Sequence, residues 1–114
     1  MGFKEDHSLE MRKSESKKIL FKYPNRIPII VEKSDNCSLP DISKKKYLVP
    51  NDMSMSQFLY VVRKRIELEP SKSLFIMINN HLVPSAKSVG VIYEDDKDED
   101  GFLYMIYSAE NTFG

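Results

Sequence analysis

The segment from Ser54 to Ile66 restricts the possible folds more than any other part of the sequence. Ser54 and Gln57 have the spacing of a capping box, in which two side chains satisfy backbone N–H groups that the start of a helix leaves free. Apolar residues then recur at helical spacing until Pro70 stops the pattern, namely Met55, Phe58, Leu59, Val62 and Ile66. We therefore predict a helix with one apolar face, which has to be buried against another layer of structure.

Strand patterns lie on both sides of this predicted helix. Before it, apolar residues alternate over 27–31, and residues 46–49 form a second short pattern that Pro50 closes. After it, residues 74–78 and 102–107 are apolar on both faces, which indicates central strands. The chain is thus predicted to place two strands before the helix and two strands after it.

The remaining segments complete the predicted order of elements. Residues 8–23 are helix formers rich in charge, they carry only a thin apolar stripe, and Pro24 stops them, so this helix is expected to lie on the domain. Residues 86–93 indicate a short helix. The acidic run 94–100 (EDDKDED) is expected to form a solvated loop.

This order predicts an α+β fold, the ubiquitin-like β-grasp with a ββαββ mixed sheet and an N-terminal helical extension. The predicted boundaries are residues 1–24 for the extension, 25–108 for the ubiquitin-like domain and 109–114 for a flexible C-terminal tail. Because 102–107 is expected to be a central strand, the tail would leave from the middle of the sheet.

Composition excludes several classes of function. The 114 residues suit one domain, and the lone cysteine cannot form an internal disulfide, which fits a reducing compartment. No apolar run is long enough for a membrane-spanning helix, and the first residues lack the apolar core of a signal peptide. The net charge is zero, but residues 1–93 hold 16 of the 17 basic residues and residues 94–114 hold 7 of the 17 acidic ones.

Candidate chemical groups are few and scattered. Cys37, His7 and His81 lie far apart on loop-like segments, which gives neither a nucleophile–base set nor metal-ligand spacing. The sequence therefore predicts no catalytic residue, no metal site and no enzyme. Two basic clusters, residues 44–46 and 63–65, have aromatic neighbours that suit nucleic acid. The acidic segment and the zero net charge argue against that reading, so no nucleic-acid partner is expected.

The strand at 46–49 points instead to peptide binding. It is short and basic and follows a long loop, which is typical of a sheet edge guarded by lysine. Leu48 points to the same side as Lys46, and an edge with an apolar side chain beside charged ones can accept an incoming peptide strand. A merely protected edge is the alternative reading.

Four stretches of the sequence are similar to a known family. KYPNRIPIIVEK (22–33), KKKYLVP (44–50), QFLYVVRKRI (57–66) and GFLYMIYSAENTFG (101–114) resemble the autophagy-related ubiquitin-like modifiers, and most of all the gamma-aminobutyrate-receptor-associated protein branch. The resemblance covers nearly the whole chain, from Phe3 to Gly114. It implies the same fold that the order of elements predicts.

The resemblance also implies a covalent modification. Family members are joined through a C-terminal glycine, here Gly114, to the amine of phosphatidylethanolamine, and this lipid is the only prosthetic group expected. E1-like and E2-like enzymes carry out the conjugation, with Phe113 as a recognition handle, and a deconjugating cysteine protease reverses it. Many members carry residues after the glycine that the protease first removes. The sequence here ends at Gly114, so a trimmed chain and an encoded terminal glycine both stay open.

A second implication is a docking site for peptides with an aromatic residue and, three positions later, an aliphatic one. The resemblance assigns an aromatic pocket to Glu15, Ile19, Pro28, Lys46, Leu48 and Phe102. It assigns an aliphatic pocket to Tyr47, Val49, Pro50, Met53, Phe58 and Val61. Met53 and Val61 stand where leucine is more usual in the family. Charge contacts to acidic residues around the motif are expected from Arg26, Lys44 and Arg65.

The function that follows is a membrane-attached adaptor in autophagy or a related organelle-membrane process. The protein is expected to be a cytoplasmic monomer that becomes reversibly attached to autophagosome, vesicle or plastid-like membranes. A different class of function is a trafficking or cytoskeletal adaptor that is never conjugated and uses only the basic N-terminal helix and the edge strand. Conjugation at the terminal glycine separates the two hypotheses.

Overall fold

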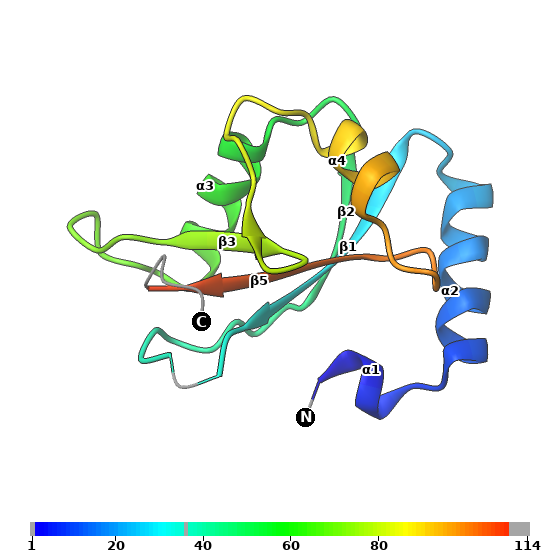
Figure 1. Cartoon of the computed structure of the whole chain (residues 1–114), viewed down its shortest axis with the longest axis horizontal. Helices are drawn as coiled ribbons and strands as arrows, with labels where there is room; N and C mark the ends of the chain where they lie inside the picture. The colour runs from blue at the N-terminus through cyan, green and yellow to red at the C-terminus, as the bar shows by residue number, and fades with distance from the viewer. Residues whose placement is uncertain (1, 36, 110–114) are drawn as a thin grey trace.

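A mixed five-stranded sheet with helices on both faces forms the molecule (Figure 1). The structure, a computed structural model, describes residues 2–35 and 37–109. The strand order is β2-β1-β5-β3-β4, with β1 and β5 parallel and the other pairs antiparallel. The elements are α1 (Phe3–Asp6), α2 (Leu9–Lys22), β1 (Arg26–Lys33), β2 (Lys46–Pro50), α3 (Met55–Arg65), β3 (Phe75–Ile78), β4 (His81–Leu82), α4 (Val89–Asp96) and β5 (Leu103–Ser108).

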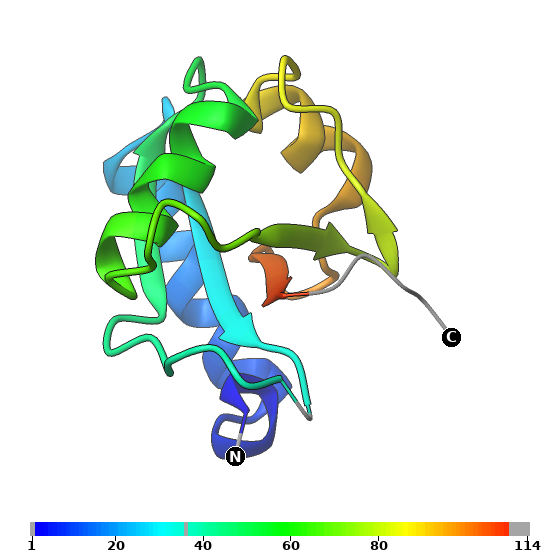
Figure 2. The ribbon, with the colours of Figure 1, turned by 90° about the vertical axis from the view of Figure 1, so that its left-hand side faces the viewer.

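The two faces of the sheet bury separate apolar clusters. In Figures 1 and 2, α3 and α4 lie on one side of the strands and α1 lies on the other. The larger cluster contains alternate residues of β1, such as Ile27 and Ile29, together with Phe58 of α3 and Ile92 of α4. The smaller cluster contains Phe3, Ile30 and Phe102, with Ile19 of α2 and Tyr104 packed against it. The helical extension is therefore part of the packed structure.

The predicted helix at 54–66 forms as α3. The Ser54 hydroxyl accepts a hydrogen bond from the Gln57 N–H group at 3.2 Å, and the Gln57 side chain accepts one from the Ser54 N–H group at 2.8 Å. These two bonds are the capping box that the sequence predicts. Phe58 and Val62, one turn apart on the apolar face, are both fully buried beneath the sheet.

The prediction of a central position holds for both β5 and β3, and in each strand one face is only partly buried. β5 lies between β1 and β3, so its apolar faces do mark a central strand. β3 lies between β5 and the two-residue β4, so it is not at the edge of the sheet. Its Phe75 and Met77 side chains are only half-buried, and Ile106 of β5, which is paired with Met77, is exposed on the same face. β4 itself has too few residues for a recognisable pattern.

The acidic segment 94–100 is only in part the solvated loop that its composition predicts, although Glu94, Asp95, Lys97 and Glu99 are exposed. Residues 94–96 form the last turn of α4, and the Asp100 side chain is only 1% exposed. The Asp100 carboxylate accepts hydrogen bonds from the Arg12 guanidinium at 2.6 Å, the Tyr104 hydroxyl at 2.5 Å and the Phe102 N–H group at 2.8 Å. The prediction is wrong for Asp100 because α2, far away in the sequence, supplies the compensating charge.

Backbone packing at the same place holds α2 against the start of β5. The Ser16 hydroxyl donates a hydrogen bond to the Asp100 carbonyl at 2.5 Å, and Ser16 is buried. Gly101 follows with a φ of 92°, in the region that favours glycine, and a Cβ atom there would collide with the Ser16 side chain. The Lys4–Asp98 ion pair, at 2.6 Å, ties α1 to the same loop.

Buried tyrosines should make this fold less stable as the pH rises through the alkaline range. Burial raises the pKa of Tyr107 to about 12, because the apolar core disfavours the phenolate. Since the unfolded pKa is about 10, this contribution to stability is complete below about pH 10 and is lost as the pH rises through about 12. We expect the Tyr107 hydroxyl to account for on the order of 2 kcal/mol of the fall in the free energy of unfolding, measured with urea, over this range.

The variant Tyr107→Phe checks the origin of this alkaline effect. It should show a shallower fall in the free energy of unfolding with pH, since it lacks the titrating hydroxyl. Tyr60→Phe, at a side chain that is 61% exposed, is the matched control and should follow the wild type. Equal pH profiles for Tyr107→Phe and the wild type would contradict the assignment.

Candidate peptide-docking site

The candidate site is built on the free edge of β2. Ile29 lies opposite Tyr47 and Pro28 lies opposite Leu48, and the Val31 N–H group donates to the Lys45 carbonyl at 2.8 Å. Hydrogen-bonded and non-bonded pairs alternate along an antiparallel ladder. The backbone groups of Lys46 and Leu48 therefore point away from β1. An incoming strand would meet these groups first.

The residues assigned to the aromatic pocket lie together on the α2 side of the sheet. Ile19 of α2 packs against the cluster that contains Phe102, and Pro28 is buried beside it on β1. The Lys46 ammonium and the Glu15 carboxylate form an ion pair at 2.6 Å that joins β2 to α2. Leu48 is half-buried on the same side of β2 as Lys46. The structure thus brings all six predicted residues to one region, with the ion pair across it.

The residues assigned to the aliphatic pocket are divided between a surface hollow and the core. Pro50, Met53 and Val61 line a hollow of 650 Å³ between the end of β2 and the start of α3. Tyr47, Val49 and Phe58 are 7% exposed or less and belong to the larger apolar cluster. These three residues support the wall of the hollow from beneath.

Four residues of the same hollow do not appear in the predicted set: Asp52, Ser56, Gln57 and Tyr60. On the aromatic side, Phe3 was also missed, although its ring lies 5.4 Å from that of Phe102 and the Lys46 ammonium lies 5.6 Å from its centroid. Tyr60 lies three positions after Gln57 in α3, so helical spacing could have placed these two side chains side by side. No local signal identifies Phe3, because its contacts come from distant parts of the chain.

Positive charge surrounds the edge strand. The Lys44 ammonium lies 5.0 Å from the centroid of the Tyr47 ring, and the Arg26 guanidinium reaches the Leu48 carbonyl at a long 3.5 Å. Burial raises the pKa of Tyr47, and the nearby charge of Arg65 partly opposes that rise. The predicted charge contacts Arg26, Lys44 and Arg65 are therefore all placed around β2. The edge suits a peptide that carries acidic residues.

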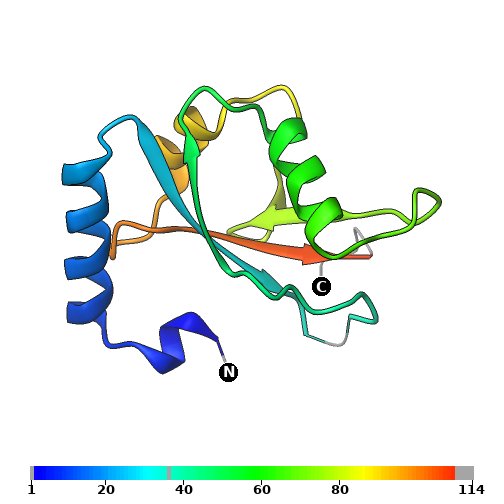
Figure 3. The same cartoon turned by 180° about the vertical axis from the view of Figure 1, so that it is seen from behind.

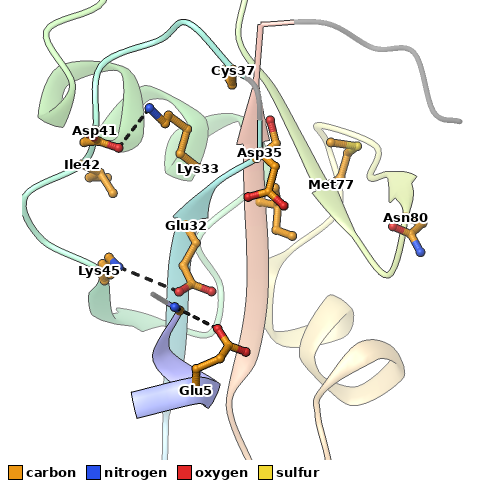
Figure 4. A pocket seen from close by; sticks show the side chains of 13 residues that line it. Glu5, Glu32, Lys33, Asp35, Cys37, Asp41, Ile42, Lys45, Met77 and Asn80 are labelled. Carbon is orange, nitrogen blue, oxygen red and sulfur yellow. Dashed lines mark hydrogen bonds and ion pairs between the residues drawn. The ribbon is translucent and has the colours of Figure 1, made fainter. Parts of the chain in front are cut away.

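A larger hollow of the described chain lies elsewhere, between α1, the end of β1 and the β3–β4 turn (Figure 4). It measures 780 Å³, and its charges are largely engaged with one another. Lys33 pairs with Asp41 at 3.0 Å, and the Glu32 carboxylate accepts the Phe3 N–H group at 2.8 Å. Over residues 2–35 and 37–109, no group of three or more histidine, cysteine, aspartate or glutamate side chains is placed to hold a metal ion. Paired charges of this kind stabilise loops and do not indicate a reaction centre.

The predicted conjugation residues, Phe113 and Gly114, lie outside the described residues. The described chain leaves the sheet at the end of β5, in its centre, and Ala109 packs against the larger apolar cluster. No helix in the described part of the chain is long and apolar enough to cross a membrane.

A mixed β-grasp sheet with α3 packed across it defines a ubiquitin-like protein, and comparison with known proteins identifies the family. Residues 11–114 match the model of the family described as autophagy protein Atg8, ubiquitin like. The chain is 59% identical to autophagy-related protein 8B of Oryza sativa over 99% of its length and 95% of that protein. It is 55% identical to autophagy-related protein 8 of Mycosarcoma maydis, over 99% and 96% of the two chains.

A solved structure agrees with these matches. The crystal structure of Trypanosoma brucei ATG8 superposes with a TM-score of 0.91 at 43% identity, covering 100% of this chain and 98% of that one. The chain belongs to the Atg8 family of autophagy-related ubiquitin-like proteins. These matches confirm the predicted family and fold, whereas the assignment to one branch of the family stays a prediction.

Proposed function

We propose that this Atg8-family protein is a modifier that is joined through Gly114 to phosphatidylethanolamine and then recruits motif-bearing proteins to the membrane. Membership of the family supports the conjugation. Glycine has no Cβ atom, which lets its carbonyl enter a narrow channel and be attacked. Two acyl chains hold a protein on a membrane stably, whereas one gives only marginal binding. The six residues after β5 can span about 20 Å at roughly 3.3 Å each, which suits entry into an enzyme channel.

The arrangement of the two pockets carries the peptide-docking part of the proposal. In an extended peptide, side chains alternate between the two faces, so residues i and i+3 point in opposite directions. Lys46 and Leu48 face α2, while Tyr47 and Val49 face α3. A strand added to β2 would therefore direct an aromatic side chain to one pocket and the aliphatic side chain three positions later to the other. This match is the observation that best supports an aromatic-x-x-aliphatic ligand.

The proposed partners follow from this function. E1-like and E2-like enzymes would activate and transfer Gly114, with Phe113 as their handle, and a cysteine protease would cut the lipid amide. The chain would be their substrate and not itself an enzyme. Its place of action would be the cytoplasmic face of autophagosomes or related organelle membranes.

A reconstituted reaction tests the conjugation. The full chain is incubated with E1-like and E2-like enzymes, ATP and liposomes that contain phosphatidylethanolamine, and the product is followed by its mobility in a gel. We expect a lipid-dependent band under conditions that conjugate a known Atg8. Absence of the band while an aromatic-x-x-aliphatic peptide still binds would favour the second candidate, an adaptor that is never conjugated.

Substitution of the outward residues of β2 tests the docking site. The double variant Lys46→Ala, Leu48→Ala should bind an acidic aromatic-x-x-aliphatic peptide roughly tenfold more weakly in calorimetry, because it loses an apolar contact and a charge. The matched control is Leu82→Ala with Lys72→Ala, which removes a leucine of β4, the strand at the opposite edge of the sheet, and an exposed lysine in the loop before β3. An unchanged titration for the β2 variant would show that the pockets are wrongly placed.

A further inference from the structure

The outer surface of α2, on the side away from the sheet, carries the most exposed large apolar side chain among the described residues. Phe21 is 91% exposed, and Tyr23, just beyond the helix, is 39% exposed. Figure 3 shows α2 standing to one side of the strands. Ile19, which packs towards the sheet, is about 160° around the helix from Phe21 at 100° per residue. Phe21 therefore has no role in the core.

Basic side chains surround this aromatic residue. We define the α2 outer surface as Met11, Lys13, Ser14, Lys17, Lys18, Phe21 and Lys22, all of which are exposed. The Lys22 ammonium lies 5.4 Å from the centroid of the Tyr23 ring. Within residues 2–35 and 37–109, no ion pair involves Lys13, Lys17 or Lys18. The surface thus holds four lysines, with Glu10 as an acidic neighbour at the start of the helix.

This combination matches the chemistry of an anionic membrane surface. Lysines contribute through attraction to acidic headgroups, and their long stems can lie along the interface with the ammonium in water. An aromatic side chain on such a helix enters the boundary between headgroups and acyl chains. A second copy of the chain fits poorly, because two surfaces with four lysines each would repel one another. An acidic protein would also satisfy the lysines, but it would need an apolar pocket of its own for Phe21, whereas a bilayer accepts an aromatic side chain anywhere on its surface.

We propose that the α2 outer surface binds anionic phospholipid bilayers, with Phe21 inserted at the headgroup boundary. This contact is separate from conjugation at Gly114 and is tested on the unconjugated chain. Ile19 of the peptide-docking site lies on the other side of the same helix, whereas Glu15, about 120° around the helix from Phe21, lies at the border between the two surfaces.

The absence of tryptophan from the chain allows a direct test of insertion. The variant Phe21→Trp carries a single tryptophan at an exposed position, so the fold should be unaffected. Addition of vesicles of phosphatidylcholine with phosphatidylserine should move its emission to shorter wavelength, and lipids brominated on the acyl chains should quench it. Tyr60→Trp is the matched control, because Tyr60 is also exposed, and the Lys64 ammonium lies 5.4 Å from its ring centroid. Its emission should not change.

Vesicle co-sedimentation gives the second measurement. Phe21→Ser should reduce binding to the anionic vesicles roughly tenfold, and Lys17→Glu with Lys18→Glu should reduce it at least as much. Wild-type binding should weaken with added salt and be absent for phosphatidylcholine alone. Tyr60→Ser should bind like the wild type.

The proposal would be overturned if the wild type did not bind anionic vesicles at low salt. It would also be overturned if neither Phe21→Ser nor the double lysine variant changed vesicle binding, or if vesicles did not alter the tryptophan emission of Phe21→Trp. Binding to soluble polyglutamate as strong as to vesicles would assign the surface to an acidic protein instead. A concentration-dependent dimer that Phe21→Ser abolishes, without vesicle binding, would assign it to a second copy.

Discussion

Replacement of Asp100 by alanine is expected to lower the free energy of unfolding by about 3 kcal/mol. The Asp100 side chain is buried and accepts hydrogen bonds from the Arg12 guanidinium, the Tyr104 hydroxyl and the Phe102 N–H group. Its removal leaves these donors without their acceptor, and the guanidinium of Arg12, only 11% exposed, without its counter-charge. Urea unfolding monitored by circular dichroism measures the change.

The matched control for Asp100→Ala is Asp95→Ala. The Asp95 side chain is 62% exposed and meets Lys87 only at 3.7 Å, so its loss should change the free energy of unfolding by less than about 0.5 kcal/mol. Asp100→Ala should also weaken binding of an aromatic-x-x-aliphatic peptide, because α2 supplies Glu15 and Ile19 to the docking site. A loss of stability no larger than that of Asp95→Ala would contradict the structural role of the buried pair.

Replacement of Gly114 by alanine is expected to abolish conjugation to phosphatidylethanolamine. The added methyl group lies on the carbon next to the carbonyl that the proposed reaction would attack, and a narrow enzyme channel would leave no room for it. The band that shifts in the reconstituted reaction should fall below detection. Binding of an aromatic-x-x-aliphatic peptide should stay unchanged, because β2 and α2 form that site far from the tail in the sequence.

Thr112→Ala provides the control within the same tail. It shortens a side chain near the end without altering the proposed acyl donor, so the conjugated band should remain. If Gly114→Ala were conjugated as well as the wild type, the acyl donor would be another residue. If both variants were inactive, the tail as a whole, and not the glycine, would determine the reaction.

The fold could be predicted from the sequence because its strongest patterns are local. Ser54 and Gln57 form the capping box of α3, and the alternation of Ile27, Ile29 and Val31 identifies the residues of β1 that face α3. The edge position of β2 follows from its lysines and from the loop before it. Each of these features depends on neighbours within a few positions of the chain.

Features that depend on contacts between residues far apart in the chain could not be predicted from the sequence. The burial of Asp100 requires Arg12, 88 positions away, and no local pattern links the two residues. The candidate docking site also contains both residues that could be predicted and residues that could not. The α2 side of β2 could be assigned from the resemblance, whereas the contribution of Phe3 appears only when α1 is seen packed against Phe102. Sequence spacing also could not distinguish the side chains that line the hollow, such as Met53, from Phe58, which supports it from the core.

The proposed function requires that Gly114 of the membrane-bound protein carries the lipid. Mass spectrometry of the C-terminal peptide, released by protease from membrane-bound protein in cells that express the chain, tests this requirement. We predict that the carboxyl group of Gly114 carries phosphatidylethanolamine and that the cytosolic pool shows the same peptide with a free carboxyl group. A membrane-bound pool whose Gly114 carboxyl is free, or whose lipid is attached to another residue, would rule out Gly114 as the conjugation site.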